Sequence, residues 1–235
     1  MVKVKYVKKE DLKLGKRGEK KGDNGRVLII GGSEDYVGCL VLAGLAALRC
    51  GADWVTIAAP EKVGWAIHSY TSELVVKKLK GKHFMKKHAG EILKLEKRFD
   101  AVLIGGGMLE DSFGFIRNYI KKSKKPLVID AGALHVVSLK NVNNSIFTPH
   151  KREFEFLLRN SGIKWKGSDS NLAHTPNPKL TNKKIRNVQQ ILDNNVIILK
   201  GEVDEIISNA GIFYNKTGNA GMTKAGTGDV LAGLA

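Results

Sequence analysis

A chain of 235 residues with 43% hydrophobic residues is long enough to bury a sizeable core, and it favours one large α/β domain over two small ones. Its 39 Lys and Arg residues against 23 acidic residues give a formal net charge of +16, which favours anionic ligands. Aromatic residues are not interleaved with the Lys-rich stretches and no common nucleic-acid-binding module is present, so we interpret the charge as a solvated surface and expect no nucleic-acid partner.

Neither a secretory nor a membrane-spanning segment is indicated. The first residues are charged and lack the apolar core of a signal peptide, and no apolar run approaches the roughly 20 residues of a membrane span. The two cysteines, Cys39 and Cys50, fall in one predicted helix, which separates them by about 16 Å and puts them beyond the reach of a disulfide. We therefore expect a cytoplasmic protein with no membrane partner.

The first strong pattern along the chain is a βαβ unit. Residues 26–30 are a continuous apolar run, which predicts a strand buried on both faces. Small apolar residues over 37–50 predict a helix that ends at Gly51 as its C-cap, and residues 54–60 predict the next strand. The crossover should be right-handed, with the two strands parallel.

Further strands, helices and turns follow the same logic. The polar first residues contain a short alternation over 2–7 that predicts an edge strand or an arm. Further strands are predicted at residues 73–76, 100–104, 126–134, 144–148 and 195–201. Helical patterns occupy much of 63–98, all of 113–122 and of 183–192, and a further segment whose first turn holds Glu153. Residues 161–182 are interpreted as a loop or lid, and residues 203–214 as a β-hairpin.

Glycines or charged residues come directly after the predicted strands. They are Gly31, Gly32, Gly105, Gly106, Gly107, Asp130, His150, Lys200 and Gly201. The carboxyl ends of parallel strands meet at one edge of the sheet, where ligands of such sheets bind. Two alternatives stay open: Asp130 holds a metal or a ligand hydroxyl, or it caps the next helix, and His150 with Glu153 lines a pocket, or the two form a capping pair.

The segment from Asn219 to Gly233 carries the sharpest chemical signal. Gly226-Thr227-Gly228-Asp229 precedes a small apolar run, which predicts a glycine loop opening into a helix whose free N–H groups suit a phosphate. A carboxylate beside phosphate repels it, so Asp229 is better explained as a base that accepts a proton from a substrate hydroxyl. The alternative is that Asp229 only caps the helix. With Lys200 neutralising phosphate charge, the pattern points to an enzyme for a phosphorylated or nucleotide ligand.

Several segments together resemble one family, the ADP- or ATP-dependent NAD(P)H-hydrate dehydratases of the ribokinase-like superfamily, once classed only as carbohydrate kinases. The resemblance lies in residues 21–33, 43–52, 148–154, 199–201, 219–222 and 228–229. It implies an α/β fold: one ribokinase-like domain over residues 1–235, with a mostly parallel central sheet flanked by helices on both faces.

The resemblance also implies an activity. Family members use a nucleotide to phosphorylate the ring hydroxyl of hydrated NADH or NADPH, and loss of phosphate restores the reduced cofactor. By position, Asp229 would be the catalytic base and would also bind substrate. The other expected substrate contacts are Cys39, Gly105, Gly107 and His150. The expected nucleotide contacts are Lys200, Gly201, Glu202, Val203, Asp204, Asn219, Gly226, Thr227 and Gly228. ADP, or else ATP, is expected with Mg²⁺, no metal ligand is assigned, and a homotetramer is expected.

Three departures from the family pattern stand out. Position 39 is usually alanine and is cysteine here, the usual Gly-Pro-Gly-Leu-Gly loop is replaced by residues 105–109 (Gly-Gly-Gly-Met-Leu), and family members continue beyond the motif, so we expect the sequence to be shortened at its C-terminus. Two other functions remain open: a small-molecule kinase for a vitamin precursor or sugar, which would release a phosphorylated product, and a non-catalytic basic binding protein on a kinase scaffold.

Overall fold

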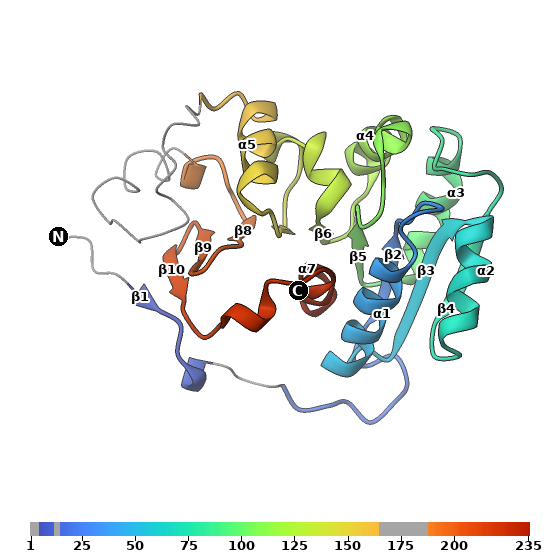
Figure 1. Cartoon of the computed structure of the whole chain (residues 1–235), viewed down its shortest axis with the longest axis horizontal. Helices are drawn as coiled ribbons and strands as arrows, with labels where there is room; N and C mark the ends of the chain where they lie inside the picture. Colours follow the sequence, from blue (N-terminus) through green and yellow to red (C-terminus); the bar gives the residue numbers. More distant parts are fainter. Residues whose placement is uncertain (1–4, 12–14, 165–187) are drawn as a thin grey trace.

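A single mixed sheet organises the molecule, with helices on both of its faces (Figure 1). The computed structural model describes residues 5–11, 15–164 and 188–235. The strands of this part are β1 Lys5–Tyr6, β2 Arg26–Ile30, β3 Trp54–Pro60, β4 Val75–Leu79, β5 Ala101–Ile104, β6 Leu127–Ile129, β7 Ser145–Phe147, β8 Val196–Leu199, β9 Asp204–Ser208 and β10 Gly211–Asn215. Their order across the sheet is β1-β10-β9-β8-β7-β6-β5-β2-β3-β4.

Every neighbouring pair from β4 across to β8 is parallel, as predicted for this sheet. Beyond β8 the direction changes, because β9 is antiparallel to β8 and β10 is antiparallel to β9, which confirms the predicted hairpin. The alternation predicted at residues 2–7 is an edge strand in its described part, since Lys5 and Tyr6 pair with Phe213 and Tyr214.

The helices divide between the two faces of the sheet. The α-helices of the described residues are α1 Gly38–Cys50, α2 Glu61–Tyr70, α3 His88–Leu95, α4 Phe113–Lys122, α5 Lys151–Asn160 and α7 Thr227–Leu234. Short 3-10 turns lie at Lys9–Asp11, Glu96–Arg98, Glu110–Ser112, Ala131–His135, Leu139–Asn141 and Ala220–Met222. Helices α3, α4 and α5 contribute to one hydrophobic cluster, and α1, α2 and α7 to the other. No helix in the described ranges is long and apolar enough to cross a membrane.

The continuous apolar run of strand β2 supplies buried side chains to both faces of the sheet. Successive side chains of a strand point to opposite faces. Leu28 and Ile30 accordingly belong to the cluster under α3, α4 and α5, whereas Ile29 belongs to the cluster under α1, α2 and α7. All three are buried, and burying such a side chain contributes about 1.5–3 kcal/mol. The strand therefore joins both halves of the core.

Two predicted strands differ in their bounds. The strand predicted over residues 126–134 ends at Ile129, because Ala131 has a φ of +46° and the 3-10 turn Ala131–His135 follows. The strand predicted at 73–76 starts only at Val75 and runs to Leu79. The lid predicted at 161–182 lies largely outside the described residues, and so does the first half of the helix predicted at 183–192.

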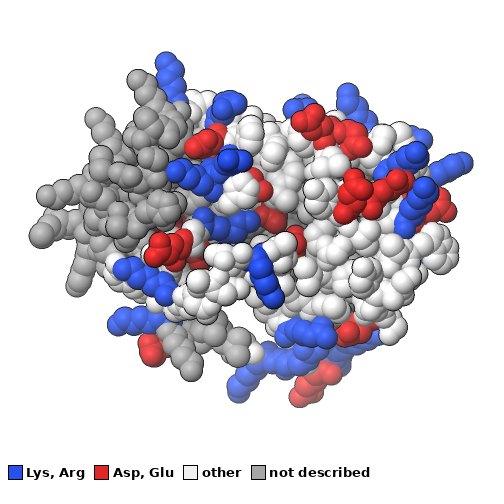
Figure 2. Space-filling view, viewed as in Figure 1, with Lys and Arg blue, Asp and Glu red and all other residues white. Residues whose placement is uncertain are grey.

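Charged side chains of both signs share the surface. On the face seen in Figure 2, acidic side chains lie among the basic ones, also within the group of Lys and Arg side chains along its lower edge. This mixed pattern agrees with the interpretation of the net charge as a solvated surface.

Candidate functional site

The glycine turns after β2 and β5 lie against each other at the carboxyl edge of the sheet. The Gly32 N–H donates to the Gly106 carbonyl oxygen at 2.8 Å, and the Gly105 N–H donates to the Ile30 carbonyl oxygen at 3.2 Å. A Cβ atom on Gly31 would overlap the Gly106 carbonyl oxygen. Glycine at these positions therefore lets two main-chain turns touch directly, which brings their strands' ends into one site.

Asp130, at the end of the neighbouring strand β6, binds Lys200 from the end of β8. Its Oδ1 atom accepts hydrogen bonds from the Thr148 hydroxyl at 2.7 Å and from the Lys200 ammonium at 3.2 Å. The Asp130 side chain is 5% exposed and that of Lys200 is 22% exposed, so the ion pair is largely shielded from solvent. No hydrogen bond from the main chain caps a helix through this carboxylate. The capping alternative for Asp130 is therefore wrong, and its partners are Thr148 and Lys200.

The loop before α7 presents the start of that helix to Lys200. Gly226 has a φ of +96°, and Thr227 stabilises the turn by donating its hydroxyl towards the carbonyl oxygens of Met222 and Lys224, both at 3.0 Å. The Val230 N–H is bonded to the Gly226 carbonyl, and the N–H groups before it lie in the first turn, where a helix leaves them without helical partners. A Cβ on Gly228 would lie 3.3 Å from Lys200 Nζ. The Lys200 ammonium group therefore lies next to the amino end of α7.

Asp229 lies beside Cys39 across Gly106. A Cβ on Gly106 would stand 3.8 Å from Cys39 Sγ and 4.0 Å from Asp229 Oδ1. Partial burial raises the pKa of Asp229, the charge of Asp130 raises this pKa further, and Lys200 opposes both effects. Burial, with the charges of Asp229 and Asp130, raises the pKa of the Cys39 thiol to about 12, so the thiol stays protonated and is a contact surface, not a nucleophile. We call Cys39, Asp130, Lys200 and Asp229 the edge cluster.

His150 caps α5 beside this cluster. Its Nδ1 accepts the main-chain N–H groups of Arg152 at 3.1 Å and Glu153 at 3.3 Å, and Glu153 Oε2 accepts the His150 N–H at 2.8 Å. This reciprocal arrangement is the capping-pair alternative. Glu153 Oε2 also lies 4.0 Å from Lys200 Nζ. The imidazole remains about half exposed, and its Nε2 lies 3.4 Å from Glu153 Oε1.

The remaining nucleotide-binding candidates lie in turns. Asp204 accepts the Gly201 N–H through Oδ1 at 3.2 Å and the Asn215 side chain through Oδ2 at 3.1 Å, so it stabilises the turn between β8 and β9. Glu202 in this turn is exposed and Val203 is partly buried. The Asn219 side chain accepts the Gly221 N–H at 2.9 Å and caps the 3-10 turn Ala220–Met222. These contacts explain the local fold and leave any role in nucleotide binding as a prediction.

The sequence patterns did not predict the contact of Thr148 with Asp130 or that of Glu153 with Lys200. Thr148 directly follows β7 and Glu153 lies in the first turn of α5, and nothing in the local spacing points to partners at Asp130 and Lys200. In the described residues no group of three or more His, Cys, Asp and Glu side chains is arranged to hold a metal ion.

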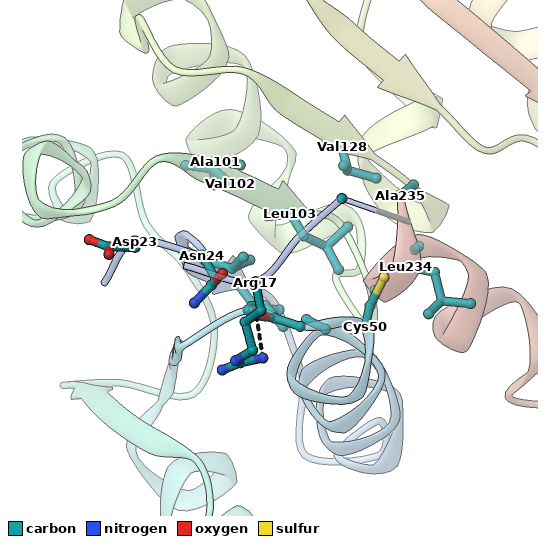
Figure 3. A pocket seen from close by; sticks show the side chains of 18 of the residues that line it. Arg17, Asp23, Asn24, Cys50, Ala101, Val102, Leu103, Val128, Leu234 and Ala235 are labelled. Carbon is teal, nitrogen blue, oxygen red and sulfur yellow. Dashed lines mark hydrogen bonds between the residues drawn. The ribbon is translucent and has the colours of Figure 1, made fainter. Parts of the chain in front are cut away.

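A cavity of about 660 Å³ lies at the opposite end of the sheet (Figure 3). Its lining includes Val27 and Ala101, which stand near the amino ends of β2 and β5, and the last residues of α7. Arg17 lies at this cavity and donates to the Gly51 carbonyl oxygen at 3.2 Å (Figure 3). None of the edge cluster lines it. Lys200 and Asp229 therefore lie outside this cavity.

Comparison with known proteins identifies the family to which the chain is similar. The model of the NAD(P)H-hydrate dehydratase family (Carb_kinase) matches residues 27–235. The bifunctional NAD(P)H-hydrate repair enzyme of Methanocaldococcus jannaschii is 38% identical over 91% of this chain and 39% of its own length. The ADP-dependent (S)-NAD(P)H-hydrate dehydratase of Natrialba magadii is 30% identical over 90% of this chain and 74% of its own length. The chain thus spans about two fifths of the length of the bifunctional relative.

Solved structures support the fold. A ribokinase-like protein from Enterococcus faecalis superposes with a TM-score of 0.75 at 23% identity, covering 98% of this chain and 78% of that chain. The ADP/ATP-dependent NAD(P)H-hydrate dehydratase of Bacillus subtilis, co-crystallised with ATP and Mg²⁺, gives a TM-score of 0.73 at 27% identity and covers 99% of this chain and 80% of that chain. The predicted ribokinase-like fold is confirmed, and with the family match this shows that the chain belongs to the NAD(P)H-hydrate dehydratase family.

Proposed function

We propose that residues 1–235 form the catalytic domain of an ADP-dependent (S)-NAD(P)H-hydrate dehydratase. The family match supports the substrate, and the relative from Natrialba magadii, which is ADP-dependent by name, supports the nucleotide. The observation that carries the proposal is the meeting of Lys200 Nζ with the amino end of α7, next to a partly buried Asp229. Phosphate binding and proton removal are thereby available within one site.

The proposed reaction has two stages. Asp229 accepts the proton of the ring hydroxyl as that oxygen attacks the terminal phosphorus of ADP, and AMP leaves. The new phosphate ester then departs as phosphate while the neighbouring ring carbon loses a proton, which restores the ring double bond and NADH or NADPH. Lys200 and the N–H groups at Gly226, Thr227 and Gly228 stabilise the charge on the transferred group. Because the described residues build no metal site of their own, Mg²⁺ would arrive with the nucleotide phosphates, as the ATP/Mg²⁺ complex of the Bacillus subtilis relative suggests.

The other predicted contacts surround this centre. We assign Cys39, Gly105, Gly107 and His150 to the hydrated cofactor, since Cys39 lies next to Asp229 across Gly106. The turn from Gly201 to Asp204 directly follows Lys200, which supports its assignment to the AMP portion, and Asn219 belongs to the loop leading into α7. A cytoplasmic location and a homotetramer remain predictions, and light scattering of the purified protein tests the second.

The test is direct. Incubation with hydrated NADH, ADP and Mg²⁺ should restore the absorbance of the reduced nicotinamide and release AMP and phosphate. A stable phosphorylated product without recovered absorbance would instead identify a small-molecule kinase. Absence of any nucleotide binding would favour the non-catalytic binding protein.

Asp229→Asn isolates the base. The variant should lose at least about 100-fold in kcat, the usual scale of general-base catalysis, while its nucleotide affinity stays close to that of the wild type. Asp193→Asn is the matched control, because Asp193 is exposed, precedes β8 at the far end of that strand, and has a φ of +46° that asparagine tolerates. Unchanged turnover in Asp229→Asn would remove this carboxylate from the mechanism.

A further inference from the structure

Asp130 is the most deeply buried charged group of the edge cluster, and the reaction described above gives it no role. Its side chain is 5% exposed at the end of β6. Oδ1 receives two donors, the Thr148 hydroxyl at 2.7 Å and the Lys200 ammonium at 3.2 Å. A carboxylate buried to this degree is stable only when such partners compensate its charge, so the pair with Lys200 is an obligate contact.

Lys200 is fixed from several directions. Its main-chain N–H donates to the Pro149 carbonyl oxygen at 2.9 Å, and its ammonium has Asp130 at 3.2 Å and Glu153 at 4.0 Å. A side chain with four rotatable carbons would otherwise sample many positions. The two carboxylates therefore hold the cation at the amino end of α7, where a Cβ on Gly228 would lie 3.3 Å from Nζ.

In this arrangement Lys200 does not form an ion pair with Asp229. Both residues are described, and no nitrogen–oxygen distance between their charged groups is as short as 4.0 Å. Within the described chain, the titratable groups that act on Asp229 are Asp130 at β6 and Lys200 at β8, and the Cys39 thiol of α1 interacts with it as well. An ammonium bound to Asp229 would neutralise the base and occupy the oxygen that must accept the substrate proton.

We propose that Asp130 is a positioning residue for phosphoryl transfer: it holds the Lys200 ammonium at the phosphate position and away from Asp229, so that Asp229 stays free to act as a base. The inference rests on the proposed function for its chemistry and on the three side chains for its geometry. Without the Asp130 charge, Lys200 turns towards Asp229. Loss of a negative neighbour and approach of a positive one both lower the affinity of Asp229 for a proton.

The experiment compares Asp130→Asn with Thr148→Val in the full chain. The side-chain carboxyl signal of Asp229, identified in ¹³C-labelled protein by its loss in Asp229→Asn, is followed as a function of pH without any substrate. Asp130→Asn should lower the midpoint of this titration by about one unit or more, the scale of a charge change at close range. Thr148→Val removes one hydrogen bond to Asp130 but no charge, so its midpoint should stay within about 0.3 units of the wild type.

Kinetics provide the second measurement. With hydrated NADH and ADP, the acidic limb of the pH profile of kcat/KM should move to lower pH in Asp130→Asn, by the same amount as the titration midpoint of the Asp229 carboxyl. The value of kcat on the plateau of the profile should fall about tenfold or more, because the base is weaker. The limb should not move in Thr148→Val. A purely structural role for Asp130 would lower activity in both variants without moving the limb.

The outcomes separate this inference from the proposed function. If wild-type protein does not restore NADH, the proposed reaction is wrong, yet the carboxyl titration still reports on Asp130. An unchanged Asp229 midpoint in folded Asp130→Asn overturns the positioning role whatever the reaction is. If Asp130→Asn does not fold, Lys200→Met is compared with the double variant Asp130→Asn/Lys200→Met, in which Asp130 no longer carries a buried charge without its cation. The midpoint should then be lower in the double variant, and equal midpoints would refute the electrostatic part of the proposal.

Discussion

The glycine turn after β5 offers the sharpest test of the site, because two neighbouring glycines face opposite surroundings. Gly105 has a φ of +124°, and a Cβ there would overlap the Asp130 carbonyl oxygen and stand 2.8 Å from Ala133 Cβ. Gly106 has no such constraint, and a Cβ there would meet only Cys39 and Asp229 at 3.8 to 4.0 Å, which is ordinary contact distance. Alanine should therefore destabilise the protein at position 105 and be tolerated at position 106.

The magnitudes follow from these contacts. Gly105→Ala combines an unfavourable backbone conformation, about 1–3 kcal/mol, with overlap against main chain that cannot move freely, about 1–3 kcal/mol. We expect the free energy of unfolding to fall by about 2–6 kcal/mol. Gly106→Ala should change it by no more than about 1 kcal/mol, since alanine restricts the unfolded chain slightly and meets no clash.

Urea unfolding of both variants measures the difference. The midpoint should fall strongly in Gly105→Ala and hardly move in Gly106→Ala, with the denaturant slope unchanged in both. Equal midpoints would refute the argument that the turn is held against Asp130. The folded Gly106→Ala variant then probes the site itself: its methyl group stands between Cys39 and Asp229, and we expect it to raise the KM for hydrated NADH by roughly tenfold, or about 1.4 kcal/mol. An unaltered KM would show that substrate does not use this gap.

Three further predictions concern single charged groups. Burial raises the pKa of Glu205 to about 7 from 4.5, and its Oε2 has no hydrogen-bond partner. Because the folded protein keeps this proton to higher pH than the unfolded chain does, the free energy of unfolding should fall by about 3 kcal/mol as pH rises from 4.5 to 7. In Glu205→Gln this fall, followed by urea midpoints, should be smaller. Main-chain hydrogen bonds, chiefly from Asn24 and Gly22, lower the pKa of Asp53, so the contribution of its carboxylate to stability is present above pH 3.8 and is lost as pH falls further. Asp53→Asn should speed tryptic cleavage within residues 16–21 at neutral pH. Unchanged cleavage would show that these hydrogen bonds do not hold the segment. Lys200→Met should weaken ADP binding by roughly tenfold or more in calorimetry, because the phosphate loses its cation, and undiminished affinity would place the nucleotide elsewhere.

Much of the fold follows from local sequence patterns. The run at residues 26–30 predicts a strand buried on both faces, and β2 has this character from Leu28 to Ile30, whose side chains alternate between the two hydrophobic clusters. The helix at 113–122 and the Gly51 C-cap were predicted at their observed positions, since amphipathic spacing and a glycine stop are local signals. The same signals place Gly105, Asp130 and Lys200 at one sheet edge.

The contacts within the site were not predictable in this way. Whether Asp130 caps a turn or binds Lys200 depends on the order of strands, in which β6, β7 and β8 are neighbours. That order brings Thr148 and Lys200 to the same carboxylate, and nothing in the local spacing encodes it. The strand predicted over 126–134 was too long because an apolar run does not reveal the positive φ of Ala131.

The edge cluster also links assembly of the chain to its ligand. Its members come from residues 39, 130, 200 and 229, so the site exists only once segments nearly two hundred positions apart have docked. Contacts of such long range form late and slowly during folding. A nucleotide that recognises the finished cluster binds the native state alone, and at a hundred times its dissociation constant it would add about 2.7 kcal/mol to the stability of the protein. The nucleotide present in the cell would thereby stabilise the folded chain against unfolding.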